Sequence, residues 1–188
     1  MKIVSGYNAV WNSILLRHFR VIHGQNFKIR GRLVIKGEKN RIVIKDDCCF
    51  NSDKSSVPIG FFTPISFWCM GNGKITIGNH CGISNAAFCS SSSITIGNNV
   101  LIGGGVKIYD TDFHSLDYTK RVDIVNDNDR KTAPVVINDD AFIGAGTIIL
   151  KGVQIGERSI VAAGSVVCKN IPADEVWGGN PAKYIREV

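Results

Sequence analysis

The chain has 188 residues, of which 44% are hydrophobic and 20% charged, a composition typical of one ordinary globular domain. Its net charge of +6 suits an anionic partner such as a phosphorylated small molecule. The basic residues are scattered without a run of like charges, and we therefore expect no nucleic-acid partner.

Residues 1–27 are expected to form a helical segment that caps one end of the fold. The pattern between Tyr7 and His18 predicts a short amphipathic helix. The partly apolar stretch 9–22 is too short and too charged to span a bilayer. We therefore expect at most peripheral membrane contact.

Cysteine spacing argues against a zinc or redox site, because none of the six thiols forms a C-x-x-C pair. With no secretory signal at the start, we expect reduced thiols, no bound metal and a cytoplasmic protein.

Two short strands are predicted at residues 28–35 and 41–45. An aromatic group follows them and suits a core or a subunit interface better than a sugar-stacking surface. It consists of Phe61, Phe62, Phe67 and Trp68.

Much of the remaining sequence repeats every six residues, with an aliphatic residue at one position and a small or β-branched residue four places later. The aliphatic positions include Ile59, Ile65, Ile77, Ile83, Ile96, Ile102, Ile108, Ile137, Ile143, Ile149, Ile155, Val161 and Val167. Three such units close a triangular coil, and stacked coils bury a continuous aliphatic column. A β-sandwich would show period two instead. The repeat predicts an all-β parallel β-helix over residues 28–170.

The repeat is interrupted after Ile108, where the next aliphatic position holds His114. Residues 109–134 are polar and are expected to leave the coil as a protruding loop, before the repeat resumes at Ile137. Long ordered loops often carry function. Residues 171–188 form a C-terminal tail.

These features resemble the hexapeptide-repeat acyltransferases, a family of galactoside, maltose, serine and polysaccharide O-acetyltransferases. The resemblance covers about residues 59–188 and rests on the hexads, the stretch DTDFHSLD at 110–117 and the motif GGNPAK at 178–183. The D-x-D-x-H form is closer to the branch that modifies sugars and polysaccharides. The resemblance implies a left-handed β-helix, a homotrimer with sites between subunits, and acetyl transfer from acetyl-CoA to a sugar or polysaccharide-precursor hydroxyl.

Three residues are candidates for catalysis. His114 matches the family's general base, and an imidazole suits proton removal from a hydroxyl at neutral pH. Asp112 could orient that imidazole or serve only as a turn cap. By resemblance, Asn85 would contact the acyl oxygen, although Ser84 competes for this role.

The resemblance also places acetyl-CoA along the later coils, between neighbouring subunits. Backbone groups with small side chains would receive the pantetheine arm, an aromatic ring would flank it, and basic side chains would meet the phosphates. These positions are Ala145, Ala163, Gly164, Phe142, Lys169, Lys183 and Arg186. Both substrates would share one groove, so we expect direct transfer without an acyl-enzyme.

Three alternatives remain at this point. The acceptor could be an amine on an amino-sugar nucleotide. A carbonic anhydrase of the same fold would need three histidines around zinc, and only four histidines exist, with His18 and His23 in the N-terminal segment. The chain could also be a non-catalytic scaffold that binds coenzyme A.

Overall fold

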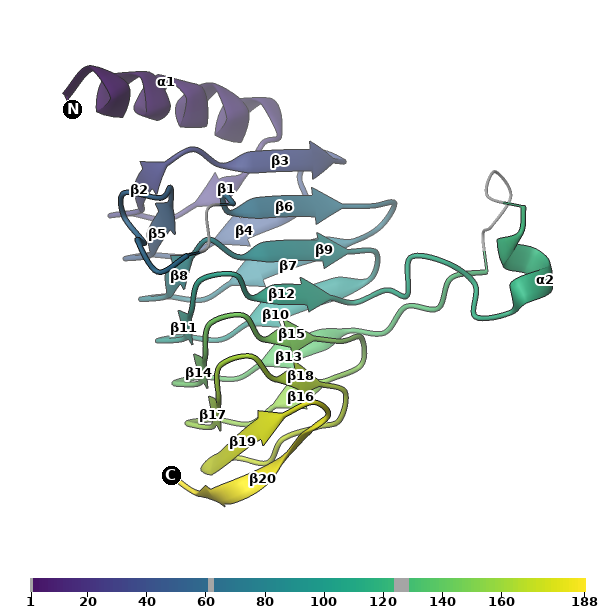
Figure 1. The fold of residues 1–188 in the computed structure, drawn as a ribbon. Helices are drawn as coiled ribbons and strands as arrows, with labels where there is room; N and C mark the ends of the chain where they lie inside the picture. Colours follow the sequence, from purple (N-terminus) through teal and green to yellow (C-terminus); the bar gives the residue numbers. More distant parts are fainter. Residues whose placement is uncertain (1, 61–62, 124–128) are drawn as a thin grey trace.

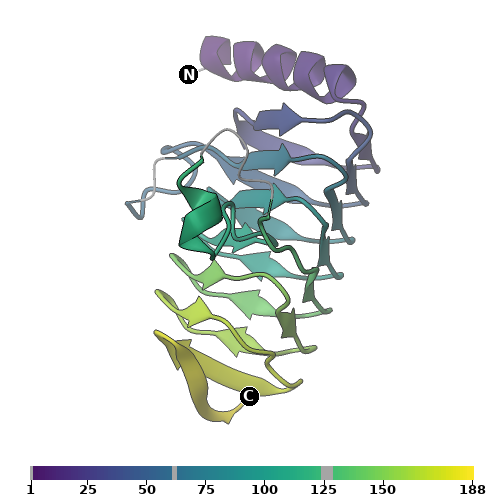
Figure 2. The ribbon, with the colours of Figure 1, turned by 90° about the vertical axis from the view of Figure 1, so that its right-hand side faces the viewer.

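A computed structural model describes residues 2–60, 63–123 and 129–188, apart from the side chains of 2–5. Three parallel sheets form the walls of a triangular column, with a helix across one end and a loop projecting from the side (Figure 1; Figure 2). Successive coils run around the three walls in turn. The predicted left-handed parallel β-helix is confirmed.

Each coil contributes one short strand to each wall. Sheet A contains β1 (Ile22–His23), β4 (Ile42–Ile44), β7 (Lys74–Ile77), β10 (Ser93–Ile96), β13 (Val135–Ile137) and β16 (Gln154–Ile155). Sheet B contains β2 (Lys28–Gly31), β5 (Cys49–Ser52), β8 (Gly82–Ser84), β11 (Leu101–Ile102), β14 (Phe142–Ile143), β17 (Ile160–Val161), β19 (Glu175–Gly179) and β20 (Ala182–Glu187). Sheet C contains β3 (Val34–Gly37), β6 (Ser66–Cys69), β9 (Ala87–Ser90), β12 (Lys107–Tyr109), β15 (Ile148–Ile149) and β18 (Val166–Val167).

The core is a set of columns in which equivalent side chains stack from coil to coil. In sheet A, Ile44, Ile77 and Ile96 occupy successive register positions, and each is about 1% exposed or less. In sheet C, the ring of Phe67 stacks on that of Phe88 with centroids 5.1 Å apart. Inward β-branched residues therefore interlock along the whole column, as the six-residue repeat predicts.

The aliphatic pattern fails before Ile65. Ile59 is 60% exposed and lies in the connection between β5 and β6, so its assignment to the repeat is wrong. The chain there makes a surface excursion, and chance spacing brought Ile59 into phase. Of the predicted aromatic group, Phe67 is buried and Trp68 points outward, whereas Phe61 and Phe62 lie outside the described residues.

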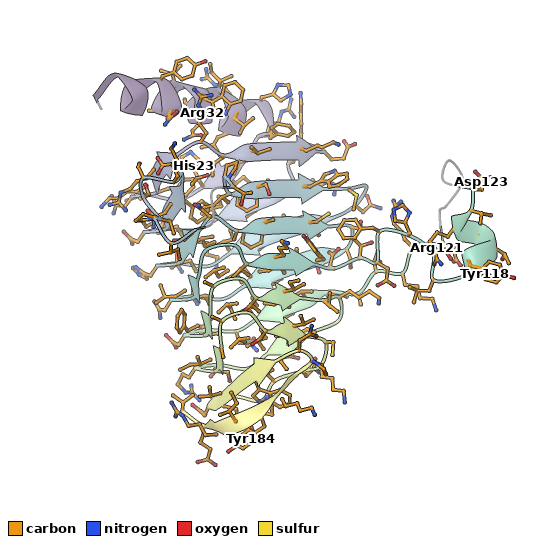
Figure 3. All side chains as sticks on the ribbon, viewed as in Figure 1. His23, Arg32, Tyr118, Arg121, Asp123 and Tyr184 are labelled. Atoms are coloured by element: carbon orange, nitrogen blue, oxygen red, sulfur yellow. The ribbon has the colours of Figure 1, made fainter. Side chains whose placement is uncertain are left out.

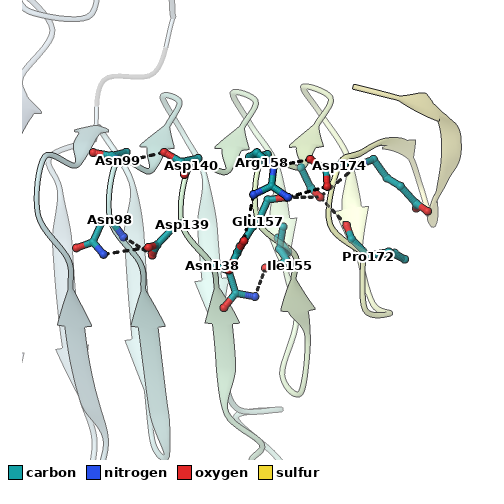
Figure 4. Close-up of polar contacts among 12 residues, drawn as sticks. Asn98, Asn99, Asn138, Asp139, Asp140, Ile155, Glu157, Arg158, Pro172 and Asp174 are labelled. Carbon is teal, nitrogen blue, oxygen red and sulfur yellow. Dashed lines mark hydrogen bonds and ion pairs between the residues drawn. The ribbon is translucent and has the colours of Figure 1, made fainter.

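Side chains at the turn between sheets A and B form a polar ladder. Asn98 Oδ1 accepts hydrogen bonds from the backbone and side-chain amides of Asn79, both at 2.9 Å. The next rung repeats this pattern, because Asp139 accepts from the backbone and side-chain amides of Asn98 at 2.7 and 3.1 Å (Figure 4). These two donors hold the pKa of Asp139 below its ordinary value. The ladder satisfies backbone N–H groups where the coil turns.

The helix α1 (Lys2–His18) covers the first coil, so the predicted helix is present and begins five residues earlier than expected. Asn12 is 4% exposed and fixes it: its Nδ2 donates to the Gly31 carbonyl and its Oδ1 accepts from the Leu33 N–H, both at 2.9 Å. Leu16 packs into the core cluster. Within the described part of the chain, no helix has the length and apolarity needed to cross a membrane.

The other end of the column closes with a hairpin. Strand β19 pairs in parallel with β17, and β20 pairs back on β19 in the antiparallel sense. This reversal ends the coil and leaves sheet B with two more strands than sheet A or sheet C.

We predict that Asn98→Ala destabilises the column by about 2 kcal/mol at neutral pH, because it removes one rung and leaves the Asn79 N–H without its acceptor. Urea unfolding measures the change. Thr95→Ala, at an exposed position of β10, is the matched control and should change stability little. Since protonation of Asp139 weakens the hydrogen bonds that it accepts from Asn98, and since the pKa of Asp139 is lowered in the fold, the Asn98→Ala effect should shrink as the pH falls below about 4. An effect equal to that of Thr95→Ala would contradict the role of the ladder.

Candidate active site

The protruding loop leaves and re-enters the column side by side. Thr111 and Thr132 form an antiparallel bridge. The Asp112 N–H donates to the Lys131 carbonyl at 3.1 Å, and the Ala133 N–H donates to the Asp110 carbonyl at 3.0 Å. These contacts make a short stem, so the position of the loop's first residues is fixed by the coil beneath them.

Asp110 anchors the stem to the preceding coil. Its carboxylate is fully buried and accepts hydrogen bonds from the Ser90 hydroxyl at 2.7 Å and from the backbone N–H groups of Ser91 and Ser92 at 2.6 and 2.9 Å. A buried carboxylate with three donors is a structural group. The contacts of Asp110 therefore support a role in structuring the loop.

Asp112 is held from the following coil by a residue that the sequence patterns did not reveal. The Lys151 Nζ lies 2.7 Å from Asp112 Oδ1, and both side chains are more than two-thirds buried. The second carboxylate oxygen, Oδ2, is buried and accepts no hydrogen bond from any described residue. Lys151 follows the inward Ile149 by two residues and occupies an ordinary turn position, so only the folded stack brings it to Asp112.

His114 lies just beyond this pair on the exposed side of the stem. Its backbone N–H donates to the Asp112 carbonyl at 2.8 Å, which turns the chain sharply. The preceding Phe113 has a φ of +66° and packs edge-on against the Tyr109 ring at 5.1 Å. The imidazole is therefore carried by a braced turn and is exposed.

The outer part of the loop forms the short helix α2 (Tyr118–Arg121). Asp117 caps it by accepting from the Thr119 N–H at 2.9 Å and the Thr119 hydroxyl at 2.7 Å, and these donors lower the pKa of Asp117. Tyr118, Arg121 and Asp123 lie at this outer end of the loop (Figure 3), where the Arg121 guanidinium donates back to the Ser115 carbonyl at 2.7 Å. Residues 124–128 of the predicted loop lie outside the described residues.

A second set of candidate residues lines the edge where sheet B turns into sheet C. Asn85 is buried there with a φ of +42°, and its carbonyl accepts from the Gly105 N–H at 3.0 Å. On later coils the same edge carries Gly146 and Gly164, whose φ values are +71° and +72°. A residue with positive φ therefore recurs at each turn of this edge, which keeps its side chains small.

This edge is hollowed near Asn85. A cavity of about 260 Å³ is lined by Asn85, Ala87, Gly105, Lys107 and Gly146, with Thr63 and Val106. Ser84, the competitor of Asn85, lies on the outer face of β8, where its hydroxyl accepts from Asn51 Nδ2 at 3.3 Å. Only Asn85 of the two lines the cavity.

The predicted cofactor residues divide between this edge and other places. Ala145, Ala163 and Gly164 lie on it, and the Gly164 N–H donates to the Ala145 carbonyl at 2.8 Å. Lys183 pairs with Gly178, and the neighbouring Gly179 N–H donates to Ser165 Oγ at 3.2 Å. Lys183 therefore lies at the lower end of the same edge.

The remaining cofactor candidates lie off the edge. Phe142 is on the outer face of sheet B, three residues before Ala145, and is 44% exposed. Arg186 pairs with Val176 near the start of the sheet B strands, and Lys169 follows β18 at the far end of the sheet C strands. Lys169 and Arg186 are thus separated from Lys183 within one chain.

Within one chain, the loop and the edge lie at opposite ends of the sheet C strands. Asn85 precedes β9, whereas the loop leaves beside Ser90, the last residue of β9. Five residues of extended strand separate these two points, a distance of about 15 Å. Figure 1 shows the loop leaving from the tips of the sheet C arrows while β8, β11 and β14 lie near their tails.

The buried thiols of Cys69 and Cys89 do not fit a nucleophile. All six cysteines are free. Burial raises the pKa of the Cys69 thiol to about 11 and that of the Cys89 thiol to about 12, so both are protonated at neutral pH.

Comparison with known proteins agrees with this architecture. Residues 134–169 match the bacterial transferase hexapeptide family (six repeats). A Schizosaccharomyces pombe protein with a provisional acetyltransferase name is 42% identical over 104 residues, which cover 55% of this chain and 48% of that protein. A hexapeptide-repeat-containing acetyltransferase of Vibrio cholerae, solved with acetyl coenzyme A, is 41% identical over 63% of each chain with a TM-score of 0.57.

These matches make the chain similar to hexapeptide-repeat acyltransferases over part of its length. A second structure of the Vibrio cholerae protein matches 96% of this chain and 80% of that one, at 29% identity and a TM-score of 0.63, so the shared fold extends to the N-terminal coils. The chain spans about half the length of the Schizosaccharomyces pombe protein. These similarities therefore leave the reaction itself to be argued from the site.

Other relatives carry different chemistry on this fold. A tetrahydropyridine dicarboxylate N-acetyltransferase of Clostridium perfringens is 54% identical over 55 residues, 29% of this chain and 23% of that protein. A mitochondrial gamma carbonic anhydrase of Arabidopsis thaliana is 38% identical over 106 residues, 48% of this chain and 37% of that protein. Among residues 2–60, 63–123 and 129–188, no three His, Cys, Asp or Glu side chains are grouped so as to hold a metal ion.

We predict that Asp110→Asn loosens the stem and destabilises the protein by about 2–3 kcal/mol, because an amide cannot accept from all three donors. Urea unfolding measures the stability, and trypsin should cleave the loop at Lys120, Arg121, Arg130 or Lys131 several-fold faster. The control is Asp117→Asn, which weakens only the exposed cap of α2. Equal loss of stability in both variants would refute the anchoring role of Asp110.

Proposed function

We propose that this protein transfers an acetyl group from acetyl-CoA directly to a hydroxyl of a sugar or polysaccharide precursor. The observation that carries the proposal is the braced loop strand Asp110–His114, in which one buried carboxylate anchors the stem and a lysine-held carboxylate precedes an exposed imidazole. A rigid support of this kind suits a general base, which must meet the acceptor at a fixed distance.

In the proposed reaction, His114 takes the proton of the acceptor hydroxyl as its oxygen attacks the thioester carbonyl. The amide of Asn85 donates a hydrogen bond to the oxyanion that forms. The carbon–sulfur bond then breaks, and the imidazolium returns its proton to the departing thiolate of coenzyme A. Asp112 stabilises the imidazolium, with Lys151 fixing the carboxylate. The protonated thiols of Cys69 and Cys89 support direct transfer without an acyl-cysteine.

The edge where sheet B turns into sheet C is our proposed site for acetyl-CoA. An extended pantetheine arm needs close approach to backbone, and Ala145, Ala163 and Gly164 leave the edge uncovered. Lys183, at the lower end, would pair with a phosphate. The acetyl-CoA complex of the Vibrio cholerae relative supports this cosubstrate.

We further propose that a complete site forms only between two copies of the chain. About 15 Å of strand lies between Asn85 and the point where the loop leaves, so His114 and the edge face each other more readily across a subunit boundary. An apolar column on sheet B supports such packing: Leu101, Phe142 and Ile160 share one register, and Leu101 is 53% exposed. A three-fold ring would repeat this interface and close, which favours a homotrimer.

Amine acetylation is the competing reaction, favoured by the N-acetyltransferase relative. Nucleotide sugars with free amines and saccharides with free hydroxyls should be assayed side by side. Acetylation of amines alone would overturn the hydroxyl proposal while leaving acyl transfer intact.

We predict that His114→Ala lowers kcat for hydroxyl acceptors by about 10²–10⁴-fold while coenzyme A binding, measured by calorimetry, is unchanged. His18→Ala, in α1, is the matched histidine control and should keep full activity. A His114→Ala enzyme with wild-type kcat would eliminate the imidazole as the base.

A mixing experiment tests the shared site. Asn85→Gly removes the amide and tolerates the positive φ, and neither it nor His114→Ala should be active alone. Refolded together in equal amounts, the two should regain roughly a quarter of wild-type activity, because random trimers then contain boundaries with both groups intact. Ala163→Trp, which would obstruct the edge, should complement His114→Ala in the same way. If mixtures stay inactive while each variant forms trimers with wild type, the site lies within one chain.

A further inference from the structure

The end of the column covered by α1 carries an exposed apolar stripe that the proposed acyl transfer does not use. Tyr7, Val10 and Ile14 are 58%, 61% and 63% exposed, and they follow one another at helical spacing of three and four residues. Trp11 lies beside them and is 43% exposed. Single exposed apolar residues are ordinary on protein surfaces, whereas three large apolar side chains in a row on one helix face indicate an interaction site.

The stripe points away from the coils. Asn12 faces the first coil through its bonds to Gly31 and Leu33. At 100° per residue, Val10 and Ile14 lie about 160° from Asn12 on either side of the opposite face. Figure 1 shows α1 lying across the end of the column, so subunits packed side by side along sheet B would leave this face uncovered.

The same end holds the positive charge of the protein. Residues 1–37 contain seven Lys and Arg and no Asp or Glu, whereas the rest of the chain contains fifteen basic and sixteen acidic residues. The basic residues are spaced apart, so the sequence shows no charged run. The fold gathers them, because α1 and the first coil are built from this segment alone.

A basic hollow lies between α1 and the first coil. It has a volume of about 720 Å³, and Arg17, Arg20 and His23 line it together with the apolar side chains of Leu16 and Phe27 and five further residues. Guanidinium groups beside apolar side chains suit a phosphate group attached to an apolar chain.

Arg32 braces the aromatic side of the stripe. Its guanidinium lies 4.5 Å from the Tyr7 ring centroid and 5.7 Å from that of Trp11, and its Nε donates to Asn8 Oδ1 at 2.8 Å. Figure 3 shows Arg32 directly beside α1. Tyr and Trp rings beside basic groups are the side chains that membrane interfaces favour.

We propose that this cap, defined by the outward face of α1 and the basic hollow beside it, binds the surface of an anionic lipid bilayer. The apolar stripe would enter the boundary between headgroups and acyl chains, and Arg17 and Arg20 would meet lipid phosphates. Cap-to-cap packing of two copies would bring two uncompensated positive ends together. Nucleic acid would satisfy the charge but would leave Val10 and Ile14 exposed.

Vesicle co-sedimentation tests the proposal on the full chain. Wild type should pellet with vesicles of equimolar phosphatidylcholine and phosphatidylglycerol and stay in solution with phosphatidylcholine alone. The double variant Val10→Asp/Ile14→Asp should bind at least about tenfold more weakly, because two aliphatic side chains no longer bury. Arg17→Gln/Arg20→Gln should weaken binding at least about fivefold.

Ile59→Asp is the matched control, since Ile59 is 60% exposed on a connection outside α1 and the first coil, and it should bind as wild type does. Circular dichroism and coenzyme A binding should be unchanged in all variants, which shows that the cap and not the fold was altered. Equal binding to both vesicle types would overturn the proposal, and so would an equal loss of vesicle binding in Ile59→Asp. It would also be overturned if duplex DNA displaced the protein from vesicles and Val10→Asp/Ile14→Asp bound vesicles as well as wild type does. So would a smaller oligomer of Val10→Asp/Ile14→Asp without lipid, because a second copy would then cover the stripe.

Discussion

Every part of this molecule depends on coils that repeat at a constant height, so that each inward side chain lies on its equivalent in the next coil. The narrow interior is filled by columns of mostly β-branched and aromatic side chains, such as the column through Ile44, Ile77 and Ile96. Backbone hydrogen bonds then run from coil to coil with little variation. A wall of this regularity holds surface groups on different coils at fixed spacings, which is what a site for an extended cosubstrate needs.

The three turns of each coil carry different kinds of residue around this core. At the turn between sheets A and B, amide and carboxylate side chains link neighbouring coils through the ladder of Asn79, Asn98 and Asp139. At the edge between sheets B and C, small residues with positive φ leave the backbone accessible. The third corner is where the chain departs into the loop, braced by Asp110 from one coil and Lys151 from another. The three corners of the triangle therefore differ in the residues that they carry, and the groups of the proposed reaction lie at only two of them.

The fold was largely predictable because one inward position per hexad leaves a strong periodic signal in the sequence. The prediction failed at Ile59, where an irregular excursion matched the period by chance. The loop was predictable for the converse reason, since His114 breaks the period. Contacts between coils were not predictable. The pairing of Lys151 with Asp112 joins residues far apart in sequence, and no pattern in either segment encodes it. The positive charge at the α1 end was not predicted either. It arises because residues 1–37 contain no acidic residues, and not from a run of basic residues.

The hydrogen bond between the Ala133 N–H and the Asp110 carbonyl means that the chain returns to the column almost where it left. An insertion between these two points neither lengthens a coil nor shifts any residue out of register, so its length and sequence are uncoupled from the stability of the scaffold. Evolution or an engineer could exchange the outer part of the excursion, beyond His114, as a cassette while the coils and their register remain as they are.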